Sequence, residues 1–545
     1  MEVKSMENQT IDGAIFKKMF VEAANYLEKN KRIVDDLNVF PVPDGDTGTN
    51  MSLTIHYAIE ELKSADETDV SKLAALVSSG ALMGARGNSG VILSQLFRGF
   101  SKGCKGKATL GVEEFAKALK SASEMAYKAV MKPTEGTILT VARGMGEFAM
   151  EHYEEYDSMD VFLLDTIKEA EKVLDRTPDM LAVLKEAGVV DAGGMGLVYI
   201  YKGMYNGLTG RETVAEEQSS IDFEKPIEDD IHSEADITFG YCTEFIIIGE
   251  NKDSDRERLK EEYNKMGDSI IVVGDEQKIK VHLHTDQPDQ AMKLALEIGS
   301  LTRIKIDNMR EQVKSKSEKK PSSKEPMKDY GIIAVSPGEG LTELFKDIGV
   351  DEVITGGQTM NPSTQDFVDC IKKIHAKTIV ILPNNSNIIL AANQSKNLTD
   401  KEVLVIESKT VPQGITALIS FDPQAEAAEN EENMRDALED VKTGQITYAV
   451  RDTTLNGTTV KKDDIIGLFD GKIVCVGKDP SQVCLDLIDQ MTDDLSELIS
   501  IYYGQDIEEE KAESTVQSIE EKYEDYDVEL HYGGQPLYYY IVSVE

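Results

Sequence analysis

The sequence predicts a multidomain protein with an all-α N-terminal domain, an α+β middle domain and an α/β C-terminal domain. A chain of 545 residues is too long for a single hydrophobic core. Residues 10–210 show almost continuous helical periodicity, whereas residues 237–312 and 328–545 contain short β runs between amphipathic helices. Polar stretches at 213–236 and 312–328 have no periodicity and are expected to be linkers.

The composition restricts the kinds of partner. Hydrophobic residues make up 41% of the chain and charged residues 29%, which is typical of a folded globular protein. The net charge of −41 argues against nucleic acid or an anionic membrane, because phosphate backbones require a basic surface. The 5 cysteines are scattered without a disulfide framework, and no apolar run approaches the roughly 20 residues of a transmembrane helix. We therefore expect a cytoplasmic protein with no transmembrane segment and no nucleic-acid partner.

Residues 38–51 carry the most informative motif, Asn-Val-Phe-Pro-Val-Pro-Asp-Gly-Asp-Thr-Gly-Thr-Asn-Met. Asp44 and Asp46 flank one glycine, after two prolines that restrict the backbone. Neighbouring carboxylates repel one another unless a cation lies between them, and Mg²⁺ commonly shares such oxygen ligands with phosphates. Thr49 or Asn50 is expected to cap the next helix, whose free N–H groups attract an anion. The combination predicts a Mg–nucleotide site.

Other interpretations of this motif are weaker. An EF-hand loop that began at Asp44 would need a ligand where Gly48 stands and a glutamate where Ile55 stands. A solvated Asp-Gly turn remains the alternative, although the prolines before it and the helix after it favour the metal site. The P-loop motif and the protein-kinase motifs are absent from the sequence.

Three further Gly-rich or polar loops precede amphipathic helices, at residues 87–90, 133–137 and 191–196. If one additional helix lies between each of these pairs, an up-and-down bundle places all four special helix N-termini at the same end. Glycines there allow the backbone to come close to phosphate oxygens. A single such loop is weak evidence, but four on alternate helices favour a phosphate site.

The motif of residues 38–51, together with Gly-Ala-Arg-Gly-Asn-Ser-Gly at 84–90, closely resembles the ATP-binding domain of the dihydroxyacetone-kinase L-subunit family. Within that family, the whole chain resembles the ATP-binding subunits of bacterial fatty-acid kinases. The resemblance implies an eight-helix barrel in which aspartates bind two Mg²⁺ ions that bridge the nucleotide phosphates.

The resemblance also assigns residues. Asp44 and Asp46 match the family's metal-binding pair, but Val39 stands where the sugar kinases carry a further aspartate. Asn38 is the candidate substitute, and because a neutral amide is a weaker ligand, the number of Mg²⁺ ions stays open. The resemblance implies phosphate contacts at Thr47 and Asn50, the phosphate-loop serine at Ser89 and the aspartate of the nucleotide-capping loop at Asp191. The helix ends and their loops add as candidate nucleotide-binding residues Thr49, Gly87, Asn88, Gly90, Thr137 and Gly193.

The middle region reads as strand, helix, strand, strand, helix, strand, the order of a ferredoxin-like sandwich. The expected elements are residues 243–248, 255–266, 269–273, 278–285, 288–298 and 301–307. His282 and His284 lie two apart on the third strand and share a face, and Cys242 begins the neighbouring first strand. These three side chains could hold Zn²⁺, or they could be two exposed imidazoles and a small buried thiol. The fatty-acid kinase subunits carry a matching Cys, His, His set, which favours zinc and leaves the fourth ligand unidentified.

The C-terminal region predicts strands at residues 331–335, 352–356, 378–382 and 402–407, an acidic helix at 426–441, and strands at 446–451, 465–469 and 472–476. This half resembles the two-lobed fold of DegV-like acyl-binding proteins. The Gly-Gly-Gln-Thr-Met-Asn-Pro-Ser segment at 356–363 follows a strand, where open α/β sheets bind ligands. It could hold a lipid or serve in docking, and docking is favoured because no charged partners for a carboxylate are evident.

The function expected from these observations and the resemblance is that of an ATP- and Mg²⁺-dependent kinase subunit. Its acceptor would be a fatty acid held by a separate DegV-like acyl-binding protein, and its product an acyl phosphate for phospholipid synthesis. A dihydroxyacetone-type kinase for a small polyol and a nucleotide-sensing scaffold without turnover are the alternatives. A homodimer is expected from the exposed sheet of the middle domain.

Overall fold

The computed structural model describes most of the chain as two compact units. The described residues are 10–38, 45–130, 133–211, 239–249, 253–274, 278–308, 327–357, 361–449, 452–455, 458–493 and 496–545. One unit combines Met1–Thr213 with Met327–Glu545, and the other is Val214–Pro326. The helical and C-terminal regions therefore belong to one unit by their contacts. The division into three domains stays a prediction. The predicted linkers lie almost wholly outside the described residues.

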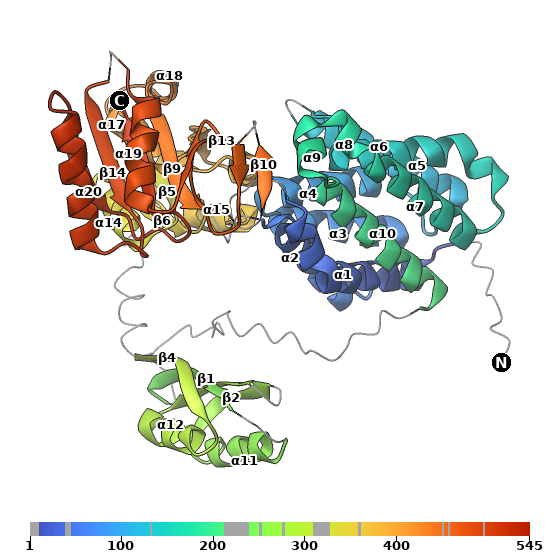
Figure 1. Ribbon diagram of the computed structural model, residues 1–545. Helices are drawn as coiled ribbons and strands as arrows, with labels where there is room; N and C mark the ends of the chain where they lie inside the picture. The colour runs from blue at the N-terminus through green and yellow to red at the C-terminus, as the bar shows by residue number, and fades with distance from the viewer. Residues whose placement is uncertain are drawn as a thin grey trace. The chain divides into compact units, whose positions relative to one another are not determined.

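The N-terminal region is a ring of helices (Figure 1). Its long helices are α1 (Gly13–Asp36), α2 (Thr47–Ser64), α3 (Val70–Met83), α4 (Gly87–Gly103), α5 (Val112–Ala129), α6 (Ile138–His152), α7 (Met159–Asp175) and α10 (Ala192–Thr209). Short turns of helix, η1 (Tyr153–Glu155), α8 (Thr177–Met180) and α9 (Ala182–Ala187), connect the later ones. Each long helix packs against the next, and α10 packs against both α7 and α1. The ring is thereby closed, in agreement with the expected eight-helix barrel.

The apolar faces of these helices fill the interior of the ring. In α1, the side chains of Phe16, Phe20 and Leu27 recur at helical spacing and are almost completely buried. Burial of one such side chain stabilises the fold by roughly 1.5–3 kcal/mol. Because the interior is apolar, the polar loops between helices lie at the ends of the ring, where the candidate site is found.

The middle region is a four-stranded antiparallel sheet with two helices on one face (Figure 1). Its elements are β1 (Tyr241–Ile248), α11 (Asp253–Tyr263), β2 (Gly267–Gly274), β3 (Lys278–Thr285), α12 (Pro288–Leu296) and β4 (Ser300–Asn308). The strand order is β2-β3-β1-β4, so the first and third strands are central neighbours. The predicted ferredoxin-like topology is confirmed.

The C-terminal region begins with a parallel sheet of order β6-β5-β7-β8. Its strands are β5 (Lys328–Ser336), β6 (Glu352–Thr355), β7 (Ala376–Leu382) and β8 (Glu402–Val405). Around them lie α14 (Glu339–Asp347), α15 (Thr364–Lys373), α16 (Ile389–Ser395), η3 (Lys396–Leu398), α17 (Val411–Ile419) and α18 (Ala427–Asp436). All four predicted strands and the acidic helix are present, with ends shifted by a few residues.

A second, mixed sheet of order β13-β12-β9-β16-β14-β15 completes this region. Its strands are β9 (Lys442–Tyr448), β12 (Ile465–Phe469), β13 (Lys472–Gly477), β14 (Leu498–Tyr503), β15 (Asp527–Tyr532) and β16 (Tyr540–Val544). The helices α19 (Pro480–Met491) and α20 (Glu509–Lys522) accompany the sheet, and β10 (Thr453–Leu455) pairs with β11 (Thr458–Val460) in a short hairpin. The two sheets give the two-lobed α/β architecture that the sequence predicted.

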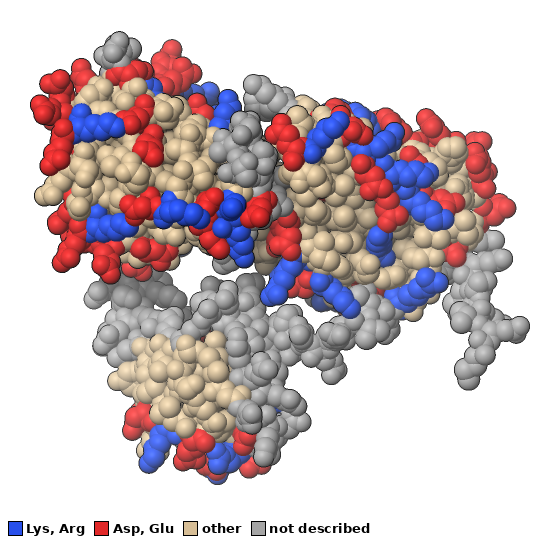
Figure 2. Space-filling view, viewed as in Figure 1, with Lys and Arg blue, Asp and Glu red and all other residues tan. Residues whose placement is uncertain are grey.

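Charged side chains cover much of the surface. Figure 2 shows lysines and arginines interspersed with aspartates and glutamates on the visible face, rather than gathered in one basic patch. In the part of the chain that the structure describes, no helix has the length and apolarity needed to cross a membrane.

Candidate nucleotide and metal sites

The helix that follows the Asp-Gly-Asp motif begins earlier than expected. Asp46 is the N-cap of α2, and the first intrahelical bond runs from the Asn50 N–H to the Asp46 carbonyl oxygen at 2.7 Å. The expectation that Thr49 or Asn50 caps the helix is therefore wrong, because both residues lie in its first turn. Aspartate is as good an N-cap residue as threonine or asparagine, so the local sequence did not distinguish these starts.

Asp35, near the end of α1, supplies the side-chain cap instead. Its Oδ1 accepts the Thr49 N–H at 3.0 Å, and its Oδ2 accepts the Thr49 hydroxyl at 2.8 Å. Burial raises the pKa of Asp35 although the hydrogen bonds from Thr49 and the Gly48 backbone act to lower it. Thr49 thus fastens α2 to α1, which leaves its hydroxyl committed within the protein.

Gly45 of the Asp-Gly-Asp motif lies beside the end of α1. Asp44 and Val39 are outside the described residues. A Cβ added to Gly45 would lie 2.8 Å from the Asp35 carbonyl oxygen and 3.7 Å from the Asn38 Cβ. Asn38 is consequently adjacent to the turn, at the position where an additional oxygen ligand was expected.

The N-terminus of α4 lies directly against α2. A Cβ on Gly87, which has φ +56°, would lie 2.6 Å from Asn50 Nδ2, and a Cβ on Gly90 would overlap the Thr54 hydroxyl. The Thr54 hydroxyl donates to the Asn50 carbonyl at 2.7 Å and accepts the Arg86 N–H at 3.4 Å. The glycines permit this close approach, so residues 87–90 and Asn50 lie against one another. Asn88 and Ser89 are half-buried in its first turn.

The N-termini of α6 and α10 meet in the same way. Thr137 is the N-cap of α6, and Asp191 is the N-cap of α10. The Asp191 Oδ2 accepts the Gly194 N–H at 2.7 Å, and the Asp191 carboxylate also accepts the Ile138 N–H. Gly193 lies against Ile138, where a Cβ would be only 3.2 Å from the isoleucine Cβ. Burial raises the pKa of Asp191 to about 6, against those two hydrogen bonds.

One more contact joins the two pairs. A Cβ on Gly196 of α10 would lie 2.6 Å from the Met51 sulfur of α2. The N-termini of α2, α4, α6 and α10 therefore lie at one end of the ring, as the alternation of loops predicted. Together they present helix-dipole ends and backbone N–H groups beside Asp46, an arrangement suited to binding an anion with a cation.

Several residues that build this end were not singled out from the sequence. Asp35 and Thr54 fasten α2 to α1 and to the loop before α4, as described above. Arg86 is the N-cap of α4, and its Nη1 donates to the Asn361 carbonyl at 2.9 Å. An aspartate near the end of a helix is the one sequence signal that could have pointed to Asp35. Asn361 lies in the C-terminal segment 356–363, for which docking was favoured, but no local signal paired it with Asp46.

In the middle region, β1 and β3 bring the predicted metal ligands together. Cys242 pairs with His284 and Glu244 with His282 in the strand register. The ligand atoms of Cys242, His282 and His284 all lie within 4.8 Å of one another, and both histidines are buried. His282 Nδ1 lies 2.8 Å from Glu244 Oε1. A carboxylate that hydrogen-bonds an imidazole in this way commonly orients the imidazole when it binds a metal. A thiol and two imidazoles are the donor set that zinc prefers, so these residues fit the ion.

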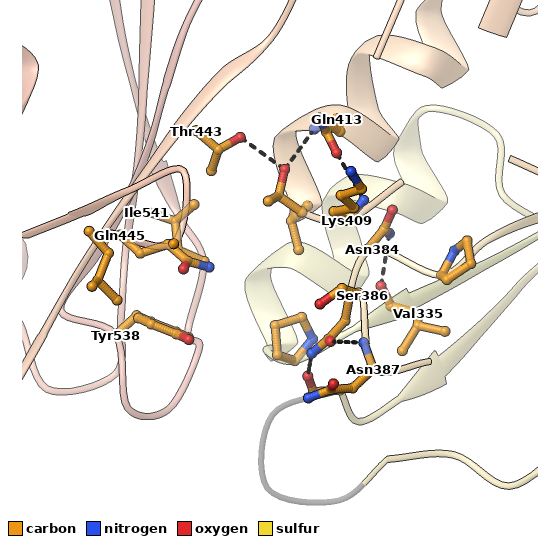
Figure 3. A pocket seen from close by; sticks show the side chains of 18 of the residues that line it. Val335, Asn384, Ser386, Asn387, Lys409, Gln413, Thr443, Gln445, Tyr538 and Ile541 are labelled. Carbon is orange, nitrogen blue, oxygen red and sulfur yellow. Dashed lines mark hydrogen bonds between the residues drawn. The ribbon is translucent and has the colours of Figure 1, made fainter. Parts of the chain in front are cut away.

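The C-terminal region contains a cavity of about 580 Å³ between its two sheets. Figure 3 shows Asn384, Ser386 and Asn387 on one side of it, and Gln445, Tyr538 and Ile541 on the other. Gly356 and Gly357 of the predicted strand-end segment line it as well, whereas residues 358–360 are outside the described residues. The cavity lies at the carboxyl ends of β5 to β8, the usual place for ligands in open α/β sheets.

Comparison with known proteins covers all three regions. The DAK2 domain matches residues 41–206, the FakA-like middle domain of fatty acid kinases matches residues 238–316, and the FakA-like C-terminal domain matches residues 331–545. Protein YloV of Bacillus subtilis is 46% identical over 554 residues, covering 99% of this chain and 100% of its own. An uncharacterized protein of Staphylococcus aureus, SAR1202, is 42% identical over 545 residues, covering 98% of this chain and 99% of its own.

Solved structures are similar to part of the chain. One is a DegV family protein of Thermus thermophilus whose structure is described as showing fatty acid binding. It aligns with a TM-score of 0.31 and 10% identity over 40% of this chain and 99% of its own. The fatty acid kinase B3 protein of Streptococcus pneumoniae, loaded with linoleic acid, aligns with a TM-score of 0.29 and 13% identity over 40% of this chain and 99% of its own. These values are too low to carry an argument about ligands.

Proposed function

Because the chain belongs to the FakA-like family of fatty acid kinase proteins, we propose that it is the ATP-binding subunit of a fatty-acid kinase. In this proposal the γ-phosphoryl group of ATP passes to the carboxylate of a fatty acid that a separate DegV-like protein holds, and the acyl phosphate serves phospholipid synthesis. The observation that carries the proposal is the clustering of four helix N-termini beside Asp46 at one end of the helical ring.

Asp44 and Asp46 are proposed to hold Mg²⁺, with the Asn38 amide oxygen as a further ligand. The bound ion would neutralise charge on the β- and γ-phosphates. Carboxylate and amide oxygens suit this hard cation, and the position of Asn38 beside Gly45 supports its inclusion. One Mg²⁺ or two remain compatible with this set.

The phosphates themselves are proposed to lie against the helix ends. Thr47 and Asn50 of α2, residues 87–90 of α4 and Thr137 of α6 are proposed to donate hydrogen bonds to phosphate oxygens. Thr137 would do so through its backbone N–H, because its hydroxyl donates to the Thr134 carbonyl at 2.8 Å. Thr49 instead contributes indirectly, because its hydroxyl is bonded to Asp35. Asp191 and Gly193 are proposed to shape the nucleotide-capping loop, where the Asp191 carboxylate already caps α10.

Phosphoryl transfer requires mainly positioning and electrostatic stabilisation, so no covalent nucleophile is needed. A carboxylate oxygen of the fatty acid attacks the γ-phosphorus, the bond from this phosphorus to the β–γ bridging oxygen breaks, and ADP leaves with the electron pair. The helix dipole ends face the charge that develops on the transferring group.

We also propose that Cys242, His282 and His284 bind Zn²⁺ in the middle region. The mutual distances of their ligand atoms and the contact of His282 with Glu244 support this assignment. The fourth ligand that tetrahedral zinc requires is not assigned. Homodimerisation through this region stays a prediction.

An assay of ATP consumption tests the proposal. Purified protein is supplied with oleate and the acyl-binding proteins of its host, or with dihydroxyacetone, and ADP is measured. Consumption that depends on oleate and the acyl-binding protein is expected. Consumption with dihydroxyacetone would favour a polyol kinase, and Mg–ATP binding without consumption in either mixture would favour a nucleotide-sensing scaffold.

A further inference from the structure

Asn361 of the C-terminal region reaches the predicted metal-binding end of the helical ring. Its Nδ2 donates to Asp46 Oδ2 at 2.6 Å. Asn361 is 1% exposed and Asp46 is 9% exposed, so the contact is almost completely removed from water. A hydrogen bond from a neutral amide to a carboxylate is charge-assisted, and such bonds are the stronger ones.

The loop that carries Asn361 is fastened to the start of α4. The Arg86 guanidinium donates to the Asn361 carbonyl and lies 3.5 Å from the carboxylate of Asp366. The Thr364 N–H donates to the Ala85 carbonyl at 3.2 Å. Because backbone and side-chain bonds both hold this loop, the Asn361 amide is presented to Asp46 in one orientation.

The amide lies among the residues proposed to bind the nucleotide phosphates. A Cβ on Gly87 would be 3.3 Å from Asn361 Nδ2 and 2.6 Å from Asn50 Nδ2. The buried Asn361 Oδ1 has no hydrogen-bond partner among the residues that the structure describes. A buried acceptor without a partner is costly, and it is commonly explained by an ion or a water that completes the site.

We propose that Asn361 is a positioning residue of the Mg–nucleotide site, supplied by the C-terminal region of the same chain. This inference rests on the proposed function, because it assigns a role to Asp46 as a metal ligand. The amide fixes the orientation of the Asp46 carboxylate, in the way that hydrogen bonds commonly orient metal ligands. Each carboxylate oxygen has two lone pairs, so the hydrogen bond at Oδ2 is compatible with a bound cation.

A blocking role fits the contact less well. A side chain that competed with Mg²⁺ for Asp46 would be expected to carry positive charge, as a lysine or arginine does. Asn361 is neutral, and the nearby Arg86 is directed to the Asn361 carbonyl and Asp366 instead. Binding of the Mg–nucleotide and seating of the Asn361 loop should consequently favour each other, since coupling between two binding events is reciprocal.

The test compares full-length wild type with Asn361→Ala and Asn361→Leu, where leucine keeps the branch point and the number of side-chain heavy atoms of asparagine but removes the donor. Gln365→Ala is the matched control, because Gln365 lies close in sequence and its partly exposed side chain bonds Asp369. Nucleotide binding and ATP turnover are measured while Mg²⁺ is titrated. We expect the Mg²⁺ concentration at half-maximal binding to rise about tenfold in both Asn361 variants and to stay unchanged in the control.

Turnover at saturating Mg²⁺ distinguishes positioning from a merely structural role. The Asn361 variants should regain most of the wild-type rate there, because excess cation compensates for a poorly oriented ligand. An unchanged or lower half-maximal Mg²⁺ concentration would overturn the inference, and so would a rate that excess Mg²⁺ does not restore. If wild type itself shows no Mg²⁺-dependent nucleotide binding, the proposed function fails. If wild type shows this binding and the Asn361 variants have the same Mg²⁺ dependence, only the inference about Asn361 fails.

Discussion

Asp35 and Thr49 are joined by two hydrogen bonds, one from the threonine N–H at 3.0 Å and one from its hydroxyl at 2.8 Å. The pair connects the end of α1 to the first turn of α2, directly beside Asp46. The position of the first turn of α2, which follows the Asp-Gly-Asp motif, therefore depends on an aspartate outside the motif.

Removal of this cap should weaken both the fold and the site. We expect Asp35→Ala to lower the free energy of unfolding by about 1–2 kcal/mol, because two donors at the start of α2 lose their acceptor. Thr49→Val, which keeps the backbone bond, should cost about half as much. Denaturant unfolding followed by helical circular dichroism measures both. Equal stability of wild type and Asp35→Ala would show that the cap contributes nothing.

The pKa of Asp191 predicts a specific pH dependence. Burial raises this pKa to about 6, above the value of about 3.9 for an unfolded aspartate. A group whose folded pKa is raised favours folding at low pH, and this contribution is lost as the pH rises through about 6. Asp191→Asn does not titrate, so wild type should gain stability relative to this variant between about pH 8 and about pH 5.

The difference in melting temperature of the helical region between wild type and Asp191→Asn, measured at both pH values, checks the sign. A difference that moves in the opposite direction would mean that the hydrogen bonds from Gly194 and Ile138 outweigh burial. The same difference at both pH values would mean that Asp191 does not titrate in this range.

The zinc proposal predicts graded effects in the middle region. Purified wild type should contain stoichiometric zinc, and His282→Ala and His284→Ala should lose it. Glu244→Gln should retain zinc with affinity about 10- to 100-fold lower, because Glu244 orients His282 without belonging to the Cys-His-His group. His531→Ala, in β15 of the C-terminal region, is the control. Elemental analysis and chelator competition give the values, and wild type free of zinc after purification in its presence would end the proposal.

The sequence was most informative where the pattern is local. The six elements of the middle region follow one another with clear periodicity, so their order and pairing could be predicted, and His282 and His284 were placed on one face correctly. The helix N-termini of the ring were predicted from the recurrence of glycine-rich loops. The start of α2 was not predicted, because Asp46 and Asn50 are equally good N-cap residues and Thr49 is also a common one.

The features that the sequence did not predict depend on long-range contacts. The bond from Asn361 to Asp46 joins residues 315 positions apart. Segment 356–363 was singled out with docking favoured, but nothing in the sequence paired it with the Asp-Gly-Asp motif. The same applies to the contacts that group the helical and C-terminal regions in one unit. Such pairings depend on how surfaces meet after each region has folded.

The most direct test of the account measures ATP binding by calorimetry in Mg²⁺ and in chelator, with wild type, Asp44→Asn, Asp46→Asn and the exposed-site control Asp66→Asn. The account predicts that wild type and the control bind ATP tightly only with Mg²⁺, and that either substitution in the pair weakens binding at least tenfold while the helical content is unchanged. Equal ATP affinity in chelator and in Mg²⁺, or equal affinity after both aspartates are replaced, would contradict it.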